Sequence, residues 1–202
     1  MDNYTEVAFM DKMDFIAGAV RGTEKMALLA EELDELADAA ELFRDCIVET
    51  RSRKGRRYTI NKYAQKDMVS EMADVMAVMI CTFHPADMRL ALEYAEMHRD
   101  EGKIRTGKDL KNELNQLISV CKIFRNMAFK HRRVGSKDNP TAVPKKHIDG
   151  MIGVAIPLLL ASMMALLDEE WEAKSEKMLK EKIERWHDRL MMLQGSDVNE
   201  QE

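Results

Sequence analysis

The sequence predicts an all-α protein, a helical bundle of about six or seven helices. The 202-residue chain is long enough to bury the core of one ordinary domain, and 46% of its residues are hydrophobic. Glycine, proline and aromatic residues are scarce (9 Gly, 4 Pro, 6% aromatic), which is typical of helical rather than sheet-based folds. Apolar residues recur every three or four positions along most of the chain, which is the spacing of amphipathic helices.

Two apolar stripes define the clearest helices in the first half of the chain. After a short helix near residues 7–20, a long amphipathic helix is expected over about 23–49, and another near 67–83. Their stripes consist of Met26, Leu29, Leu33, Leu36, Ala40, Phe43 and Ile47 in the first, and Met68, Met72, Val75, Met79 and Phe83 in the second. Between these helices, residues 51–66 (RSRKGRRYTINKYAQK) are expected to form a basic connector.

Four further helices are expected in the rest of the chain, near residues 86–100, 108–131, 147–167 and 168–193. Gly102 and Gly107 mark a loop after the first of these. A second loop is expected over residues 132–146, which contain Pro140 and Pro144. Residues 195–202 should form a frayed tail.

Two segments of the chain resemble each other, which indicates an internal duplication. ELDELADAAELFRD (Glu32–Asp45) aligns without a gap with ELNQLISVCKIFRN (Glu113–Asn126), and five of the fourteen positions are identical. Each copy is followed by a basic segment and then by an apolar, Met-rich helix. We therefore expect one compact domain made of two related helical hairpins, residues 1–107 and 108–194. Chance similarity between two amphipathic helices is the alternative.

Composition and charge exclude several classes of protein. The net charge of −5 (31 Lys and Arg against 36 Asp and Glu) provides no positive field that would attract nucleic acid. The three cysteines, Cys46, Cys81 and Cys121, lack the spacing of a disulfide framework or a zinc site and fit a reducing cytoplasm. Residues 150–167 are uncharged, but Pro157 interrupts them and no aromatic belt flanks them. We therefore expect a cytoplasmic protein that binds neither nucleic acid nor a membrane.

Acidic residues form two short motifs on neighbouring predicted helices. The first is EExxE, formed by Glu31, Glu32 and Glu35, and the second is ExxD, formed by Glu71 and Asp74. Residues three apart lie on neighbouring turns of one helix face, so each motif can direct a pair of carboxylates toward one point. Both pairs flank the apolar stripe of their helix in the same sense. Packing of the two stripes against each other would therefore gather four carboxylates at one groove.

Such a group of carboxylates requires a counter-charge. Like charges that are gathered beside a core repel one another and are costly to bury unless cations bind between them. Mg²⁺ and Mn²⁺ prefer oxygen ligands and are the natural choice. A solvated acidic face is the alternative for either motif alone. The ExxD pair weakens that alternative, because residues 72–88 contain only Asp74 and Asp87 as charged residues.

The two motifs resemble those of the all-α nucleoside triphosphate pyrophosphohydrolases, a superfamily that includes MazG, the dimeric dUTPases and phosphoribosyl-ATP pyrophosphohydrolase. The resemblance rests on KMALLAEELDELADAAE (Lys25–Glu41) and SEMADVMAVM (Ser70–Met79) and covers about the first hundred residues. It implies an enzyme that uses Mg²⁺, or Mn²⁺ in its place, to cleave a (d)NTP to the (d)NMP and pyrophosphate. A role in nucleotide-pool sanitation would follow.

The resemblance also implies roles for individual acidic residues. Glu32, Glu35, Glu71 and Asp74 would be the metal ligands. Glu31 and Glu35 would be the catalytic residues, with Glu31 as an auxiliary ligand or as the base that activates the attacking water.

Basic residues are the candidates for binding the substrate phosphates, namely Lys25, Arg56, Arg99, Lys103, Lys182 and Arg185. Arg56 belongs to the basic connector. The resemblance implies phosphate contacts for Arg99 and Lys103, which follow the ExxD motif. Their counterparts in the second copy are Lys182, Arg185 and Arg189. Solvent-exposed salt bridges are the alternative for these residues.

The second half departs from the acidic pattern. Glu35 corresponds to Gln116, and Asp74 corresponds to Gly153. We therefore expect one catalytic half and one degenerate half, which resembles the dimeric dUTPases, and the second half would help to line a nucleoside pocket. A homodimer is left open, because Met-rich helices suit either an internal or an intersubunit core.

Two other classes of protein share parts of this pattern. A ferritin-like di-iron site needs two ExxH motifs, and Glu184 with His187 provides only one. A non-catalytic nucleotide-binding or adaptor module, built on a degenerate version of the same fold, remains the alternative. Metal-dependent hydrolysis of a nucleotide would distinguish the enzyme from that module.

Overall fold

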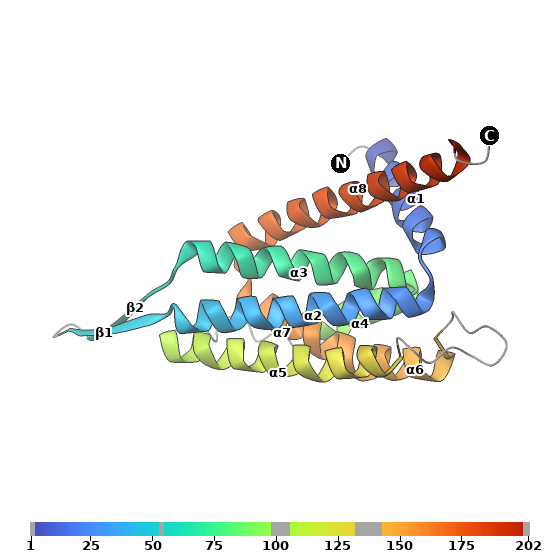
Figure 1. Ribbon diagram of the computed structural model, residues 1–202. Helices are drawn as coiled ribbons and strands as arrows, with labels where there is room; N and C mark the ends of the chain where they lie inside the picture. The colour runs from blue at the N-terminus through green and yellow to red at the C-terminus, as the bar shows by residue number, and fades with distance from the viewer. Residues whose placement is uncertain (1–2, 53–54, 98–105, 132–142, 200–202) are drawn as a thin grey trace.

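The structure, a computed structural model, describes residues 3–52, 55–97, 106–131 and 143–199. These residues form helices and one β-hairpin, so the all-α prediction is confirmed (Figure 1). In chain order the elements are α1 (Asn3–Ala19), α2 (Gly22–Asp45), β1 (Val48–Ser52), β2 (Gly55–Thr59), α3 (Lys62–Thr82), α4 (Pro85–Met97), α5 (Gly107–His131), α6 (Lys145–Gly150), the π-helical turn η1 (Met151–Ala155), α7 (Ile156–Leu166) and α8 (Glu169–Asn199).

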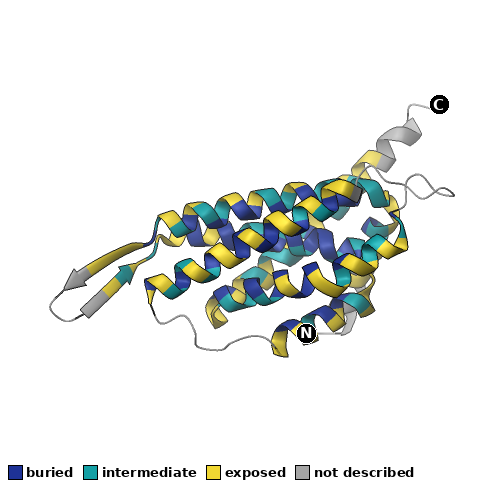
Figure 2. Ribbon diagram, turned by 90° about the horizontal axis from the view of Figure 1, so that it is seen from below, coloured by how far each residue is buried: buried dark blue, intermediate teal, exposed yellow. Residues whose placement is uncertain are grey.

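Helix α2 occupies the middle of the bundle, between α3 and α5 (Figure 1). Helix α8 lies along α3, α1 packs against α8 and α3, and α7 packs against α4 and α5. Every residue of the two predicted apolar stripes is at most 3% exposed, because the stripes of α2 and α3 face the common core. In Figure 2 the buried residues, in dark blue, face the interior of the bundle.

Strands β1 and β2 pair antiparallel, so the basic connector expected over 51–66 contains much of a hairpin and, from Lys62, the start of α3. The preceding helix, expected to run to about residue 49, ends at Asp45. The register pairs Val48 with Thr59 and Ser52 with Gly55, and the hairpin projects beyond the bundle (Figure 1). Basic residues dominate this segment, but β-branched and aromatic residues alternate with them and favour strands. Helix α3 therefore begins at Lys62, where the Asn61 side chain accepts a hydrogen bond from the Tyr63 amide (2.9 Å).

The apolar helix expected over 147–167 is a helical run, Lys145–Leu166, that η1 interrupts. Pro157 follows this π turn, and a proline cannot donate to the carbonyl four residues earlier, so a local change of hydrogen bonding fits this place. By length and composition the run is able to cross a membrane, and 44% of its most apolar window is buried. Helix α7 packs against α4 and α5, which accounts for the buried part of this run.

The two internally similar segments lie on α2 and α5, which pack side by side. Arg125 donates from Nε to Asp34 Oδ2 (2.8 Å), and Arg44 donates from Nη1 to Asn115 Oδ1 (2.9 Å). Asp34 aligns with Asn115 and Arg44 with Arg125, so each contact becomes the other when the segments are exchanged. Two elements packed about a local two-fold axis have this pattern. The duplication itself stays a prediction.

The C-terminal segment expected to fray is helical as far as it is described. Helix α8 continues through Gly195 to Asn199. A helical glycine costs only about 1 kcal/mol relative to alanine, and no proline stops the helix before that point.

Candidate metal centre

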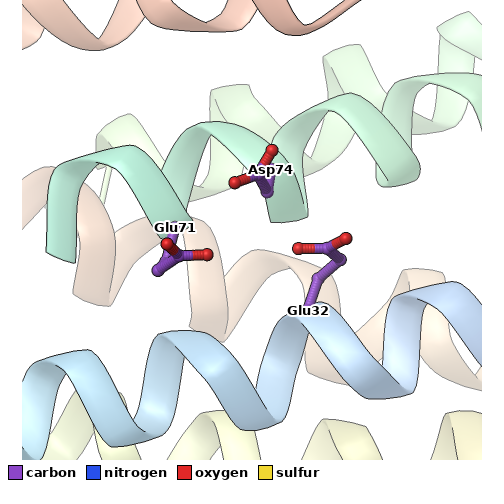
Figure 3. A group of neighbouring side chains, drawn as sticks. All are labelled: Glu32, Glu71 and Asp74. Atoms are coloured by element: carbon purple, nitrogen blue, oxygen red, sulfur yellow. The ribbon is translucent and has the colours of Figure 1, made fainter. Parts of the chain in front are cut away.

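Three carboxylates from two helices meet at one point beside the core. Glu32 projects from α2, while Glu71 and Asp74 project from α3, and the three side chains face one another (Figure 3). One oxygen atom from each carboxylate lies within 4.8 Å of the others. The adjacent Leu33 and Met72 are fully buried, so the packing of the two stripes fixes the positions of these acids.

The environment of these carboxylates disfavours their charged forms. Burial, reinforced by the charges of Glu35 and Glu71, raises the pKa of Glu32 to about 7. Burial also raises the pKa of Glu71. The Oε2 atom of Glu71 is buried and has no hydrogen-bond partner among the described residues. A divalent cation with oxygen ligands fits this arrangement, because it would satisfy that atom and neutralise the cluster.

Helix α8 brings one cation to the cluster. The Lys182 ammonium forms an ion pair with Asp74, and the Lys182 and Asp74 side chains are only 14% and 25% exposed. Burial lowers the pKa of Lys182, while the nearby charges of Glu71 and Glu32 oppose that shift. One lysine therefore faces three carboxylates, which leaves negative charge for a further cation.

A pocket of about 270 Å³ lies next to the carboxylates, between α2, α3 and α8. We call it the indole pocket, and its lining comprises Leu28, Glu32, Asp74, Ala77, Val78, Lys182, Arg185, Trp186 and Arg189. Part of the lining is apolar or aromatic and part is charged. Such a pocket suits a ligand with a flat apolar portion and an anionic portion.

The two remaining acids of the EExxE motif lie outside the trio. Glu35 and Glu31 are both exposed. Their charges still act on Glu32, and that of Glu35 also acts on Glu71, so both lie near the centre. The expected convergence of four carboxylates is thus observed for three, and the catalytic roles of Glu31 and Glu35 stay predictions.

The basic candidates are placed differently from one another. Lys182 and Arg185 both line the indole pocket. Lys25 does not, because its ammonium donates to the carbonyl of Ala17 (2.5 Å) and its side chain is buried near α1. The structure therefore gives no support to Lys25 as a phosphate ligand.

Three other basic candidates have no described side chain. Arg56 lies on β2, in the projecting hairpin, and only its backbone is described. Arg99 and Lys103 lie outside the described residues.

Two residues that the sequence points to, but that were not among the predicted site residues, also lie at this pocket. Arg189 and Trp186 line the pocket together with Lys182 and Arg185. All four lie on one face of α8, at spacings of three and four residues. This spacing is a signal in the sequence, but salt bridges to solvent and core packing produce the same pattern.

Comparison of the chain with protein-family models, with curated proteins and with solved structures gave no match. The fold and the site therefore define a class only, an all-α bundle with a half-buried group of three carboxylates. The likeness to the pyrophosphohydrolases rests on the EExxE and ExxD motifs.

Proposed function

We propose that the protein is a Mg²⁺-dependent nucleoside triphosphate pyrophosphohydrolase, which cleaves a (d)NTP to the (d)NMP and pyrophosphate. The observation that carries this proposal is the meeting of Glu32, Glu71 and Asp74 within 4.8 Å, at the edge of a pocket with an indole and two arginines. A role in cytoplasmic nucleotide-pool sanitation follows from this activity. The EExxE and ExxD motifs support the same reaction through their resemblance to this superfamily.

The acidic side chains have different roles in the proposed reaction. Glu32, Glu71 and Asp74 hold the metal, which when bound would neutralise the phosphates and lower the pKa of the attacking water. Glu35 adds negative charge at the rim, and Glu31 accepts the proton of the water. The water oxygen bonds to the α-phosphorus, the bond from that phosphorus to the bridging oxygen breaks, and pyrophosphate leaves.

The pocket residues bind the rest of the substrate. Trp186 provides a flat surface for the base, since aromatic rings stack on one another. Arg185 offers a planar fork of donors for phosphate oxygens. Lys182, which pairs with Asp74, would be able to contact a substrate phosphate if a metal took Asp74 as a ligand.

Release of pyrophosphate tests this proposal. The wild-type protein and the Glu71→Gln variant are incubated with a panel of canonical and modified (d)NTPs in Mg²⁺, in Mn²⁺ and in EDTA. We expect release with either metal, none in EDTA, and none from Glu71→Gln. Glu113→Gln is the matched control, because Glu113 aligns with Glu32 in the half without the acidic motif, and this variant should keep its activity.

A non-catalytic nucleotide-binding module is the second candidate. The ion pair between Lys182 and Asp74 favours it, because a lysine already neutralises one of the three carboxylates. Binding of nucleotides without pyrophosphate release from any of them, in either metal, would establish this candidate in place of the enzyme.

A further inference from the structure

A second pocket lies in the same interhelical groove as the metal centre. It has a volume of about 420 Å³ and lies between the start of α3 and residues 171–181 of α8. We call it the lysine pocket, and its lining comprises Lys66, Trp171, Lys174, Lys177, Met178 and Glu181. Three lysines face one glutamate there, so this pocket is positive in a protein whose net charge is −5.

The lysines of this pocket differ in how far they are committed to other contacts. Lys174 lies over the Trp171 ring (4.2 Å to the centroid) and pairs with Glu170 (2.5 Å). Lys177 is 80% exposed and forms an ion pair with Glu181 at 3.8 Å, which is too long for a hydrogen bond. Lys66 is exposed and has no ion-pair or hydrogen-bond partner in the described part of the chain. Lys66 is thus available to an anion, and the ion pair of Lys177 is long and exposed enough for an anion to replace it.

The lysine pocket lies at a defined distance from the carboxylates. Helices α3 and α8 pack together, with Lys66 and Lys177 at one pocket and Asp74 and Lys182 at the ion pair further along. Both helices therefore run in the same direction. Five residues separate Lys177 from Lys182 and eight separate Lys66 from Asp74, which is about 7.5 Å and about 12 Å at the helical rise of about 1.5 Å per residue.

The indole pocket lies on the opposite side of the carboxylates. Val78 and Trp186 follow Asp74 and Lys182 by four residues on their helices, about 6 Å further along. The groove between α3 and α8 thus presents, in order, a positive pocket, a group of carboxylates and a pocket with an aromatic wall.

We propose that the lysine pocket binds the two terminal phosphates of a nucleoside triphosphate, which become the pyrophosphate product. This proposal rests on the proposed function and adds to it the direction of the substrate along the groove. The nucleoside lies against Trp186, the α-phosphate lies at the carboxylates, and the terminal phosphates lie between Lys66 and Lys177. The phosphates bind at the positive end of the groove because lysines attract phosphates as point charges. The base binds at the other end because it stacks on an aromatic ring.

Binding of inorganic tripolyphosphate in Mg²⁺, measured by calorimetry, tests the lysine pocket directly. Each of Lys66→Ala and Lys177→Ala should weaken binding about tenfold, which is the effect of losing one charge-assisted hydrogen bond. Lys66→Arg should keep most of the affinity. Lys146→Ala is the control, because Lys146 is exposed on α6, outside both pockets, and its loss should leave binding unchanged. Equal affinities in all variants, or no binding to the wild type, would overturn the proposal.

Steady-state kinetics distinguish failure of this pocket from failure of the proposed function. In the Lys66→Ala/Lys177→Ala variant, KM should rise for a (d)NTP far more than for the corresponding diphosphate. If the double variant hydrolyses the (d)NTP with the same KM as the wild type, the lysine pocket does not bind the phosphates, while the proposed function still holds. If tripolyphosphate binding depends on the two lysines but no nucleotide is hydrolysed, the phosphate-binding role of the pocket holds and the proposed enzymatic function is wrong.

Discussion

Glu32 is the carboxylate whose ionisation is most strongly perturbed, with a pKa raised to about 7 by burial and by neighbouring acids. In the unfolded chain its pKa returns to the ordinary range near 4.3. At a pH between these two pKa values, Glu32 keeps its proton in the folded protein and loses it in the unfolded chain. The folded state is therefore favoured at low pH, and the free energy of unfolding falls as the pH rises toward 7. Glu71, whose pKa is also raised, adds to the same trend.

Replacement of Glu32 by glutamine should reduce this dependence on pH. We expect the urea midpoint of the wild type, measured in EDTA, to be lower at pH 8 than at pH 5, beyond any difference in Glu32→Gln. Saturating Mg²⁺ should raise the wild-type midpoint at pH 8, because it binds the charged carboxylates. Identical pH profiles for the two proteins would show that Glu32 ionises as it does in water.

Two further substitutions separate catalysis from folding. Glu35→Gln and Asp74→Asn should each lower turnover about a hundredfold or more, since Asp74 is one of the three candidate metal ligands and Glu35 provides negative charge beside them. Circular dichroism should show unchanged helix content, because Glu35 is exposed and Asp74 half-buried. Loss of helix in either variant would instead assign that residue a structural role.

The sequence contains enough information to predict the acidic trio but not its partner on α8. The spacing within each motif and its position beside an apolar stripe place Glu32, Glu71 and Asp74 together once α2 and α3 pack. The pairing of Lys182 with Asp74 depends instead on which face of α8 packs against α3. That choice is a long-range packing outcome, and no local pattern in α8 specifies it.

At the scale of elements, the hairpin is the main departure from the predicted fold. Its base lies close to the start of α5, where a Cβ added to Gly107 would lie only 2.8 Å from the Tyr58 Cβ and 3.0 Å from Glu49 Oε1. The hairpin within the expected basic connector was not predicted, because basic side chains interrupt the β-branched and aromatic residues that favour its strands.

Two glycine substitutions test this contact. Gly107→Ala should destabilise the protein by about 1–3 kcal/mol through overpacking against Tyr58. Gly150→Ala is the matched control, because Gly150 has a helical backbone (φ −66°, ψ −36°) and no atom near the added methyl group. It should stabilise the protein by about 0.5–1 kcal/mol. Thermal unfolding measures both, and a neutral Gly107→Ala would mean that the hairpin base moves freely away from α5.

At the scale of the whole molecule, one hydrophobic core joins the two halves. Phe43 on α2 and Phe124 on α5 are aligned in the internal similarity, and both belong to the main core cluster, with exposures of 1% and 0%. The periodicity of the sequence predicted Phe43 as a core residue, and the internal similarity aligns Phe124 with it. The periodicity did not predict that α2 would have its most extensive packing with α5 rather than with α3, since chain order favours neighbouring helices as partners.

This shared core predicts cooperative unfolding. Phe43→Ala and Phe124→Ala, in different halves, should each lower the free energy of unfolding by about 3–5 kcal/mol and shift one common transition. Circular dichroism and tryptophan fluorescence should report the same midpoint in each variant. Two separate transitions, each moved by only one of the substitutions, would show that the halves fold independently.

The identity of the phosphorus that is attacked tests the central claim most directly. Phosphorus NMR of a (d)NTP incubated with the protein and Mg²⁺ resolves the two modes of cleavage, with EDTA and Glu71→Gln as controls. We predict signals of the (d)NMP and pyrophosphate in equal amounts, absent from both controls. Signals of the diphosphate and inorganic phosphate, or an unchanged triphosphate, would contradict the account.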